Sequence, residues 1–304
     1  MEDFNYEGFI KILRNKQEDL LNYLPNQLNE IYDENNRIIT KNFLYFRGES
    51  PVCLVSHLDT VHTELPKNVL YEKSSGLMWS PQGIGGDDRC GTFALLSILA
   101  SQLENNKQKP TMLFTTNEEV GCVGASVAAN EIPTEMMAHI KFLVEIDRRG
   151  IDDCVFYNTR NAEFENFIEG FGFTKNRGSC SDISKLSPVL NVASTNVSAG
   201  YFNEHTKSEY INVTYLMDTI NKVINILNDD RTLNGDKFEY QPDPEPVYKY
   251  DYSNYSNKNK PKSKWTNYNY DYYDDYDYLN GDFPYEEEEK YLQKLYGKDW
   301  KKYY

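Results

Sequence analysis

Histidine and carboxylate residues stand at the ends of three short apolar runs in the sequence. VCLVS is followed by His57 and then Asp59, TMLFTT by Glu118 and Glu119 within NEEVG, and KFLVEI by Asp147. Apolar runs of this length are typical of strands buried in a central sheet. Because sites in open α/β sheets form outside the carboxyl ends of the strands, we expect these side chains to converge there.

A glycine-rich turn, SPQGIGGDDRCG at residues 80–91, carries two adjacent carboxylates, Asp87 and Asp88. Glycines ahead of a helix are typical of phosphate sites. Here Asp88 stands where the third glycine of GxGxxG would be, and two carboxylates would repel a phosphate. They attract a divalent cation, and imidazole with carboxylate suits zinc, with cobalt or manganese as alternatives. We therefore expect the glycines to shape a metal-binding turn.

Five motifs, in the order HLDT, GGDDRCG, NEEVG, EID and NEHT, resemble those of the co-catalytic zinc peptidase superfamily. That superfamily includes tripeptide aminopeptidase, acetylornithine deacetylase and the single-domain zinc aminopeptidases. The resemblance extends from about residue 50 to residue 228. Each motif alone is weak, whereas five in the family's order are a specific signal. The resemblance implies a centre with two Zn2+ ions.

The resemblance also implies a ligand role for five motif residues. His57 and Asp147 would bind the first metal ion, and Glu119 and His205 would bind the second. Asp87 would bridge the two ions and would be followed by a cis peptide bond. A bridging ligand has to be a carboxylate, because neutral imidazole cannot span two ions.

Two further carboxylates match positions with other roles in the family. Glu118 would be the general base, taking a proton from the bridging water and passing it to the leaving amine. Asp59 would lie behind His57 and orient its imidazole. Taken alone, Glu118 and Glu119 are better explained as a solvated corner at the end of a strand.

Two later segments, RGSCSDIS and NVSAGYFNEHT, are also similar to the family, which places them at the rim of the active site. Turn and helix-capping chemistry explains their polar residues equally well. Cys90 and Cys180 are close to the motifs, but no basic partner in the sequence indicates a cysteine nucleophile. The candidate substrate contacts are Arg148, Asp182, Asn196, Ser198 and Tyr201.

The chain is shorter than some relatives between the last two motifs. Relatives of the acetylornithine deacetylase type insert a lid or dimerisation domain after the aspartate that matches Asp147. Here 57 residues, 148–204, separate Asp147 from His205, which is too few for such a domain. The spacing therefore favours the single-domain aminopeptidase form, without the lid histidine that stabilises the tetrahedral intermediate in some relatives.

The net charge and the cysteine content bear on the classes of partner and on the location of the protein. A formal net charge of -15 over 304 residues disfavours binding to nucleic acid and to anionic membrane surfaces. The five cysteines are odd in number and lack CxxC spacing, which favours a reducing, cytoplasmic location. The acidic N-terminal segment MEDFNYEGF does not resemble a signal peptide, and no run of apolar residues is long enough to span a membrane.

Strand-like and helical segments alternate over residues 1–230, the predicted catalytic domain. This alternation predicts an α/β three-layer sandwich, with a central mixed, mostly parallel sheet flanked by helices. An Asp-Glu-Asn-Asn turn also predicts a hairpin between NEIY and IITKNFLYFRG. Helices are expected at FIKILRNKQEDLLNYL, CGTFALLSILASQL, GASVAANEI, AEFENFIEGF and VTYLMDTINKVINIL.

The remaining sequence has a different composition. Residues 231–283 are rich in Tyr, Asp and Asn, and so few aliphatic residues predict a disordered tail. Residues 284–304 have the composition of a short acidic helix, with Pro284 at its start. A solvated tail is the simpler interpretation, and docking on an unknown protein partner or on the catalytic domain is the alternative.

The function we predict is a zinc-dependent exopeptidase, an aminopeptidase that removes N-terminal residues from peptides. An N-acyl amino acid deacylase or deacetylase with the same metal site is the alternative, in which Arg148 or Arg149 would receive the substrate carboxylate. A non-catalytic binding protein on a peptidase fold is the alternative of another class. It is disfavoured because every expected metal position and the base are present in the sequence.

Overall fold

An eight-stranded sheet is the centre of the computed structural model, which describes residues 4–157 and 159–242. The four inner strands β6, β3, β7 and β10 are parallel. The strands next to them, β2 and β8, are antiparallel to β6 and β10, so the sheet is mixed as predicted. In spatial order the strands are β1 Arg37–Ile39, β2 Phe43–Phe46, β6 Thr111–Thr115, β3 Val52–His57, β7 Phe142–Arg148, β10 Ala193–Ser198, β8 Asp153–Val155 and β9 Thr174–Lys175.

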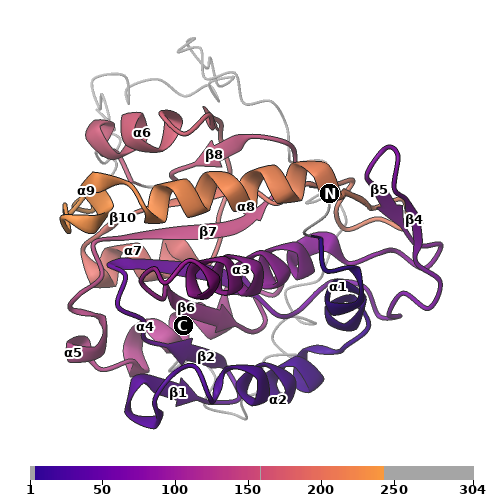
Figure 1. Ribbon diagram of the computed structural model, residues 1–304, viewed down its shortest axis with the longest axis horizontal. Helices are drawn as coiled ribbons and strands as arrows, with labels where there is room; N and C mark the ends of the chain where they lie inside the picture. The colour runs from indigo at the N-terminus through magenta and orange to yellow at the C-terminus, as the bar shows by residue number, and fades with distance from the viewer. Residues whose placement is uncertain (1–3, 158, 243–304) are drawn as a thin grey trace, which may run out of the picture. The chain divides into compact units, whose positions relative to one another are not determined.

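Helices cover both faces of this sheet, which confirms the predicted three-layer α/β fold (Figure 1). Neighbouring residues of a strand enter different cores: Leu54 packs on the face of α3 and α8, and Val55 on the face of α4 and α7. Strands covered on both faces are mostly apolar, as the first four residues of β3, VCLV, are. The helices are α1 Tyr6–Leu13, α2 Gln17–Leu28, α3 Gly86–Glu104, α4 Val123–Glu131, α5 Thr134–Met137, α6 Ala162–Glu169, α7 Ile183–Leu190, α8 Val213–Leu227 and α9 Asp230–Leu233, with a 3-10 turn at Glu34–Asn36.

The structure also contains a second, four-stranded sheet, whose strands were not predicted from the sequence. Its order is β11 Tyr201–Phe202, β12 Tyr210–Asn212, β5 Leu77–Trp79 and β4 Leu70–Glu72. β5 leads into the glycine-rich turn, and the β11–β12 hairpin encloses the loop that carries His205. Because β12 pairs with β5, this small sheet joins two motifs that are far apart in the sequence.

One predicted hairpin is wrong. Strand β1 pairs with β2, so the hairpin lies within IITKNFLYF, and NEIY is at the end of α2 and the turn after it. Thr40 explains the position of the turn, because its hydroxyl oxygen accepts hydrogen bonds from the backbone of Asn42 and Phe43. Hydroxyl-to-backbone bonds of this kind stabilise tight turns.

Globular packing continues beyond residue 230, where we expected the catalytic domain to end. Helix α9 follows α8, and Phe238 is buried against Phe142, Phe164 and Phe167. The rest of the predicted tail, from residue 243, and the predicted helix at 284–304 lie outside the described residues. Among the helices that the structure describes, none combines the length and apolarity needed to cross a bilayer.

Candidate metal centre

The Asp87 carboxylate lies between two imidazoles at the carboxyl edge of the parallel strands. Its Oδ1 is 3.0 Å from His57 Nε2, and its Oδ2 is 3.2 Å from His205 Nε2. Asp147 Oδ1 is 3.3 Å from His57 Nε2, and Glu119 Oε2 is 3.0 Å from His205 Nε2. The structure thus brings together all five residues predicted as ligands, with one oxygen of Asp87 facing each histidine.

Asp59 connects the first histidine to the NEEVG turn. Its Oδ1 is 3.2 Å from His57 Nδ1, and its carboxylate accepts hydrogen bonds from the backbone N–H groups of Glu118 and Glu119. Burial acts to raise the pKa of Asp59, but His57 and these N–H groups outweigh it and lower the pKa below its ordinary value. Asp59 is therefore an ionised group that orients both an imidazole and the turn with two glutamates.

The centre contains more buried carboxylate than the described protein groups neutralise. Burial, together with the Asp87 and Glu119 carboxylates, raises the pKa of Asp147 to about 6. Burial and neighbouring carboxylates also raise the pKa of Glu118 and of Glu119 above their ordinary values. Among the described residues, no hydrogen-bond partner reaches the buried Oε1 of Glu119. Divalent cations would neutralise this charge, so the donor set fits zinc ions.

The glycine-rich turn is held by Glu209, which the sequence analysis did not single out. Glu209 is buried, its Oε1 accepts from Asp87 N, and its Oε2 accepts from Gly85 N, both at 3.0 Å. His62 Nε2 lies 2.6 Å from Oε2. Gly83 leaves room for that ring, because a Cβ there would lie 2.4 Å from His62 Cε1. The sequence feature that could have identified Glu209 is its position four residues after His205, in the same short loop.

Asp88, next to Asp87, has its own backbone partners. Its Oδ1 accepts from Gly91 N at 2.8 Å, and its Oδ2 accepts from His57 N at 3.3 Å. The peptide bond between Asp87 and Asp88 is cis, as the resemblance implies. Side-chain oxygens of Asp88 and Asp147 lie close enough to a His57 nitrogen to share an ion, so Asp88 is a further potential ligand.

The candidate substrate contacts mostly face other protein groups. Asn196 Oδ1 accepts from Asp147 N at 2.9 Å, and the Tyr201 hydroxyl donates to Asp147 O at 2.8 Å. Ser198 is buried and donates to Arg149 O. Asn196 and Tyr201 therefore support Asp147, and Ser198 supports the adjacent backbone.

The other two candidates are also held within the protein. Arg148 donates to Arg177 O at 3.2 Å, and its Nε is 3.9 Å from Asp153 Oδ2. Asp182 is buried and accepts a hydrogen bond from the Thr115 hydroxyl. Burial raises the pKa of Asp182 to about 7, with nearby carboxylates acting in the same direction.

A cavity of about 520 Å3 opens beside His205. Its polar lining and its position next to the imidazole suit an extended polar ligand such as a peptide. The lining residues are Val61, His62, Thr63, Glu64, Pro81, Gln82, His205, Thr206 and Lys207.

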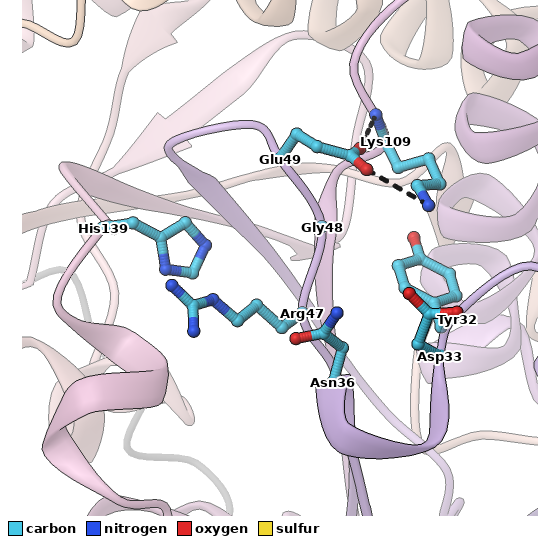
Figure 2. Close-up of a pocket in the computed structure, with 8 residues that line it drawn as sticks. All are labelled: Tyr32, Asp33, Asn36, Arg47, Gly48, Glu49, Lys109 and His139. Atoms are coloured by element: carbon cyan, nitrogen blue, oxygen red, sulfur yellow. Dashed lines mark hydrogen bonds and ion pairs between the residues drawn. The ribbon is translucent and has the colours of Figure 1, made fainter.

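A second cavity, of about 330 Å3, lies at the amino ends of the parallel strands, where β6 and β7 begin (Figure 2). Figure 2 shows Arg47 and His139 on one side of it and Glu49 with Lys109 on the other. Lys109 is already paired, through Nζ and its backbone N–H, with the Glu49 carboxylate. None of the residues predicted to bind metal lines this cavity.

One protein-family model matches the part of the chain that carries most of these motifs. The model of Peptidase family M28 matches residues 45–184, a range that contains His57, Asp87, Glu119 and Asp147 but ends before His205. No curated protein matches the chain in sequence.

Solved structures of aminopeptidases share the fold. Aminopeptidase PepT from Bacillus cereus is 13% identical with a TM-score of 0.55, covering 73% of this chain and 96% of its own. A tripeptidase from Staphylococcus aureus is 14% identical with a TM-score of 0.55, covering 72% and 95%. A TET aminopeptidase from a marine-sediment Thaumarchaeota archaeon is 12% identical with a TM-score of 0.53, covering 76% and 100%.

The predicted resemblance to the co-catalytic zinc peptidase superfamily is confirmed by the family match together with the shared fold. Identities this low establish the fold, and the family match covers the range in which four of the five predicted ligands lie. Together they support a hydrolase of the metallopeptidase type.

Proposed function

We propose that the protein is a zinc-dependent aminopeptidase with two metal ions. His57 and Asp147 would hold the first ion, Glu119 and His205 the second, and Asp87 would bridge them. The observation that carries the proposal is the Asp87 carboxylate, whose two oxygens each lie within 3.2 Å of a different imidazole. A carboxylate placed between two nitrogen donors is the arrangement that a shared ligand requires.

The pair of ions would supply a water of lowered pKa and would polarise the scissile carbonyl. The residues of the chain then have to move the proton. Glu118 suits this role, because its Oε2 is 4.0 Å from His57 Nε2 and its Oε1 is 3.6 Å from Cys122 Sγ. The NEEVG turn that carries it is fixed by Asp59. Glu118 would take the proton from water and transfer it to the leaving amine.

Two observations favour an aminopeptidase over an N-acyl amino acid deacylase. Both arginines that would receive a substrate carboxylate have protein partners: Arg148 binds Arg177 O, and Arg149 pairs with Glu204. The three acidic ligands together with Asp59 and Glu118 would carry five negative charges against the four positive charges of two zinc ions. This small negative excess favours a free N-terminal ammonium over the carboxylate of an N-acyl amino acid. A peptide substrate with a free amino terminus therefore suits the site better.

The test is hydrolysis of matched peptides with free and acetylated N-termini by zinc-loaded protein. We expect release of N-terminal residues from the free peptides alone. Glu118→Gln should lower kcat by about 100-fold or more, because it removes the base, while zinc content stays at the wild-type level. Hydrolysis of acetylated substrates alone would favour the deacylase, and full activity of Glu118→Gln would exclude Glu118 as the base.

A further inference from the structure

Two cysteines lie next to each other beside the proposed base. Cys122 Sγ is 3.8 Å from Cys180 Sγ and 3.6 Å from Glu118 Oε1. Cys122 is buried at the start of α4, and Cys180 is exposed, just before α7. Helices α4 and α7 pack against each other on one face of the sheet, so the two thiols are held together by the fold.

The two thiols have different reactivity. A hydrogen bond from Cys122, aided by Ser184 and the Lys185 ammonium, lowers the pKa of the Cys180 thiol to about 6, although partial burial acts in the opposite direction. The same hydrogen bond and burial raise the pKa of Cys122. An exposed thiolate beside a buried thiol is the arrangement of an attacking and a resolving cysteine.

We propose that Cys122 and Cys180 form a reversible disulfide that switches off the active site when a low-molecular-weight disulfide such as oxidised glutathione accumulates. The formation of the bond depends only on the thiol pair. Its effect on hydrolysis rests on the proposed aminopeptidase function and on Glu118 as the base.

The chemistry proceeds by two thiol–disulfide exchanges. The Cys180 thiolate attacks one sulfur of oxidised glutathione, the S–S bond breaks, and one glutathione leaves as its thiolate. Cys122 then loses its proton, and its sulfur attacks Cys180 Sγ and displaces the second glutathione thiolate. Two protein thiols are oxidised to a disulfide, one oxidised glutathione is reduced to two glutathione molecules, and these take up the two protons.

Disulfide formation would act directly on Glu118. A disulfide bond is about 2.05 Å long, so the two sulfurs have to move closer by about 1.8 Å. Cys122 ends the tight turn that starts at Glu118, because Cys122 N donates to Glu118 O at 2.9 Å. The movement therefore displaces the turn. It also removes the single thiol proton of Cys122, for which Cys180 Sγ and Glu118 Oε1 are the two acceptors within reach.

The remaining cysteines are unsuited to this exchange. Cys53, Cys90 and Cys154 are all buried. Burial raises the pKa of Cys154 to about 12 and raises those of Cys53 and Cys90 as well. Cys154→Ser is consequently a matched control for the Cys180→Ser variant.

The test exposes zinc-loaded, full-length protein to oxidised glutathione, and then maps its peptides by mass spectrometry after blocking free thiols. We expect a linked peptide pair containing Cys122 and Cys180, and a fall in kcat of about tenfold or more that dithiothreitol reverses. Cys154→Ser should respond in the same way. Cys180→Ser should keep its basal activity and lose the response.

Three results would overturn the proposal: free thiols at both positions after exposure, a Cys180–glutathione adduct that never resolves, or a linked pair with undiminished kcat. If no form of the protein hydrolyses any peptide, the aminopeptidase proposal fails by itself. The presence or absence of the linked peptide still decides whether the thiol pair forms the bond.

Discussion

Glu209 is the residue whose contacts best explain the position of the bridging carboxylate. It accepts hydrogen bonds from the backbone N–H groups of Gly85 and Asp87, and it is buried and close to His62. Partners that orient a metal ligand in this way contribute to metal affinity, because they fix the ligand before the ion binds. The turn would therefore be part of the proposed metal centre, although Glu209 itself contacts neither predicted histidine ligand.

Substitution of Glu209 should weaken metal binding without removing a ligand. In Glu209→Gln the amide NH2 faces a backbone N–H donor, so one buried hydrogen bond is lost. We expect zinc affinity, measured by competition with a chelating dye, to fall by about 10–100-fold. Glu131→Gln, at the exposed end of α4, is the matched control and should bind like wild type. Unchanged affinity in Glu209→Gln would show that the turn does not depend on this carboxylate.

At the scale of elements, the four-stranded sheet determines whether the two halves of the centre meet. β5 precedes the glycine-rich turn, and β12 follows the His205 loop, with Tyr210 paired to Trp79. The parallel strands β3, β6 and β7 place the remaining predicted ligands, His57, Glu119 and Asp147, at their carboxyl ends. His205 is the most exposed of the predicted ligands, and its loop is attached through the small sheet.

A core substitution in the small sheet should therefore lower the stability of the folded protein. Ile211 in β12 is fully buried, and Ile211→Ala should lower the free energy of unfolding by about 2–5 kcal/mol, because it leaves a cavity. Leu70→Ala, in the same sheet but 49% exposed, should change it by less than about 0.5 kcal/mol. Urea unfolding of zinc-loaded protein measures both values. Equal effects of the two substitutions would contradict the role given to Ile211.

The sequence predicts the large elements better than the small ones. Apolar runs such as VCLVSH and TMLFTT identify the inner strands, and the residues after them identify the motif positions. The strands of the small sheet are two or three residues long, so no periodicity can be read from them. The contact between Glu209 and the glycine-rich turn depends on how β12 pairs with β5, which is a tertiary property. The same holds for Cys122 and Cys180, which meet only because α4 packs on α7.

At the scale of the whole molecule, the buried carboxylates would couple the proposed metal binding to folding. The acidic centre lies within a chain of net charge -15, and burial and neighbouring carboxylates raise the pKa of Glu118, Glu119 and Asp147 there. An ion that binds only the folded state stabilises it by mass action. Zinc should therefore act as a structural ligand as well as a catalytic one.

Thermal unfolding tests this coupling. Saturating zinc should raise Tm by about 5–10 °C relative to chelator-treated protein, which corresponds to a few kcal/mol for a domain of this size. The Glu118→Gln variant should show the same shift, because Glu118 is not a proposed ligand. A Tm that is independent of zinc in both proteins would mean that the centre does not bind the ion in the folded state.

The central claim is that Asp87 bridges two metal ions, and the most direct measurement is zinc content per chain. Wild-type protein and Asp87→Ala would be loaded with zinc and freed of excess metal. Their zinc content would be measured by inductively coupled plasma mass spectrometry, and circular dichroism would confirm that both proteins are folded. We expect two zinc ions per wild-type chain and at most one in Asp87→Ala. Two ions retained by Asp87→Ala, or fewer than two bound by wild type, would contradict the bridged centre.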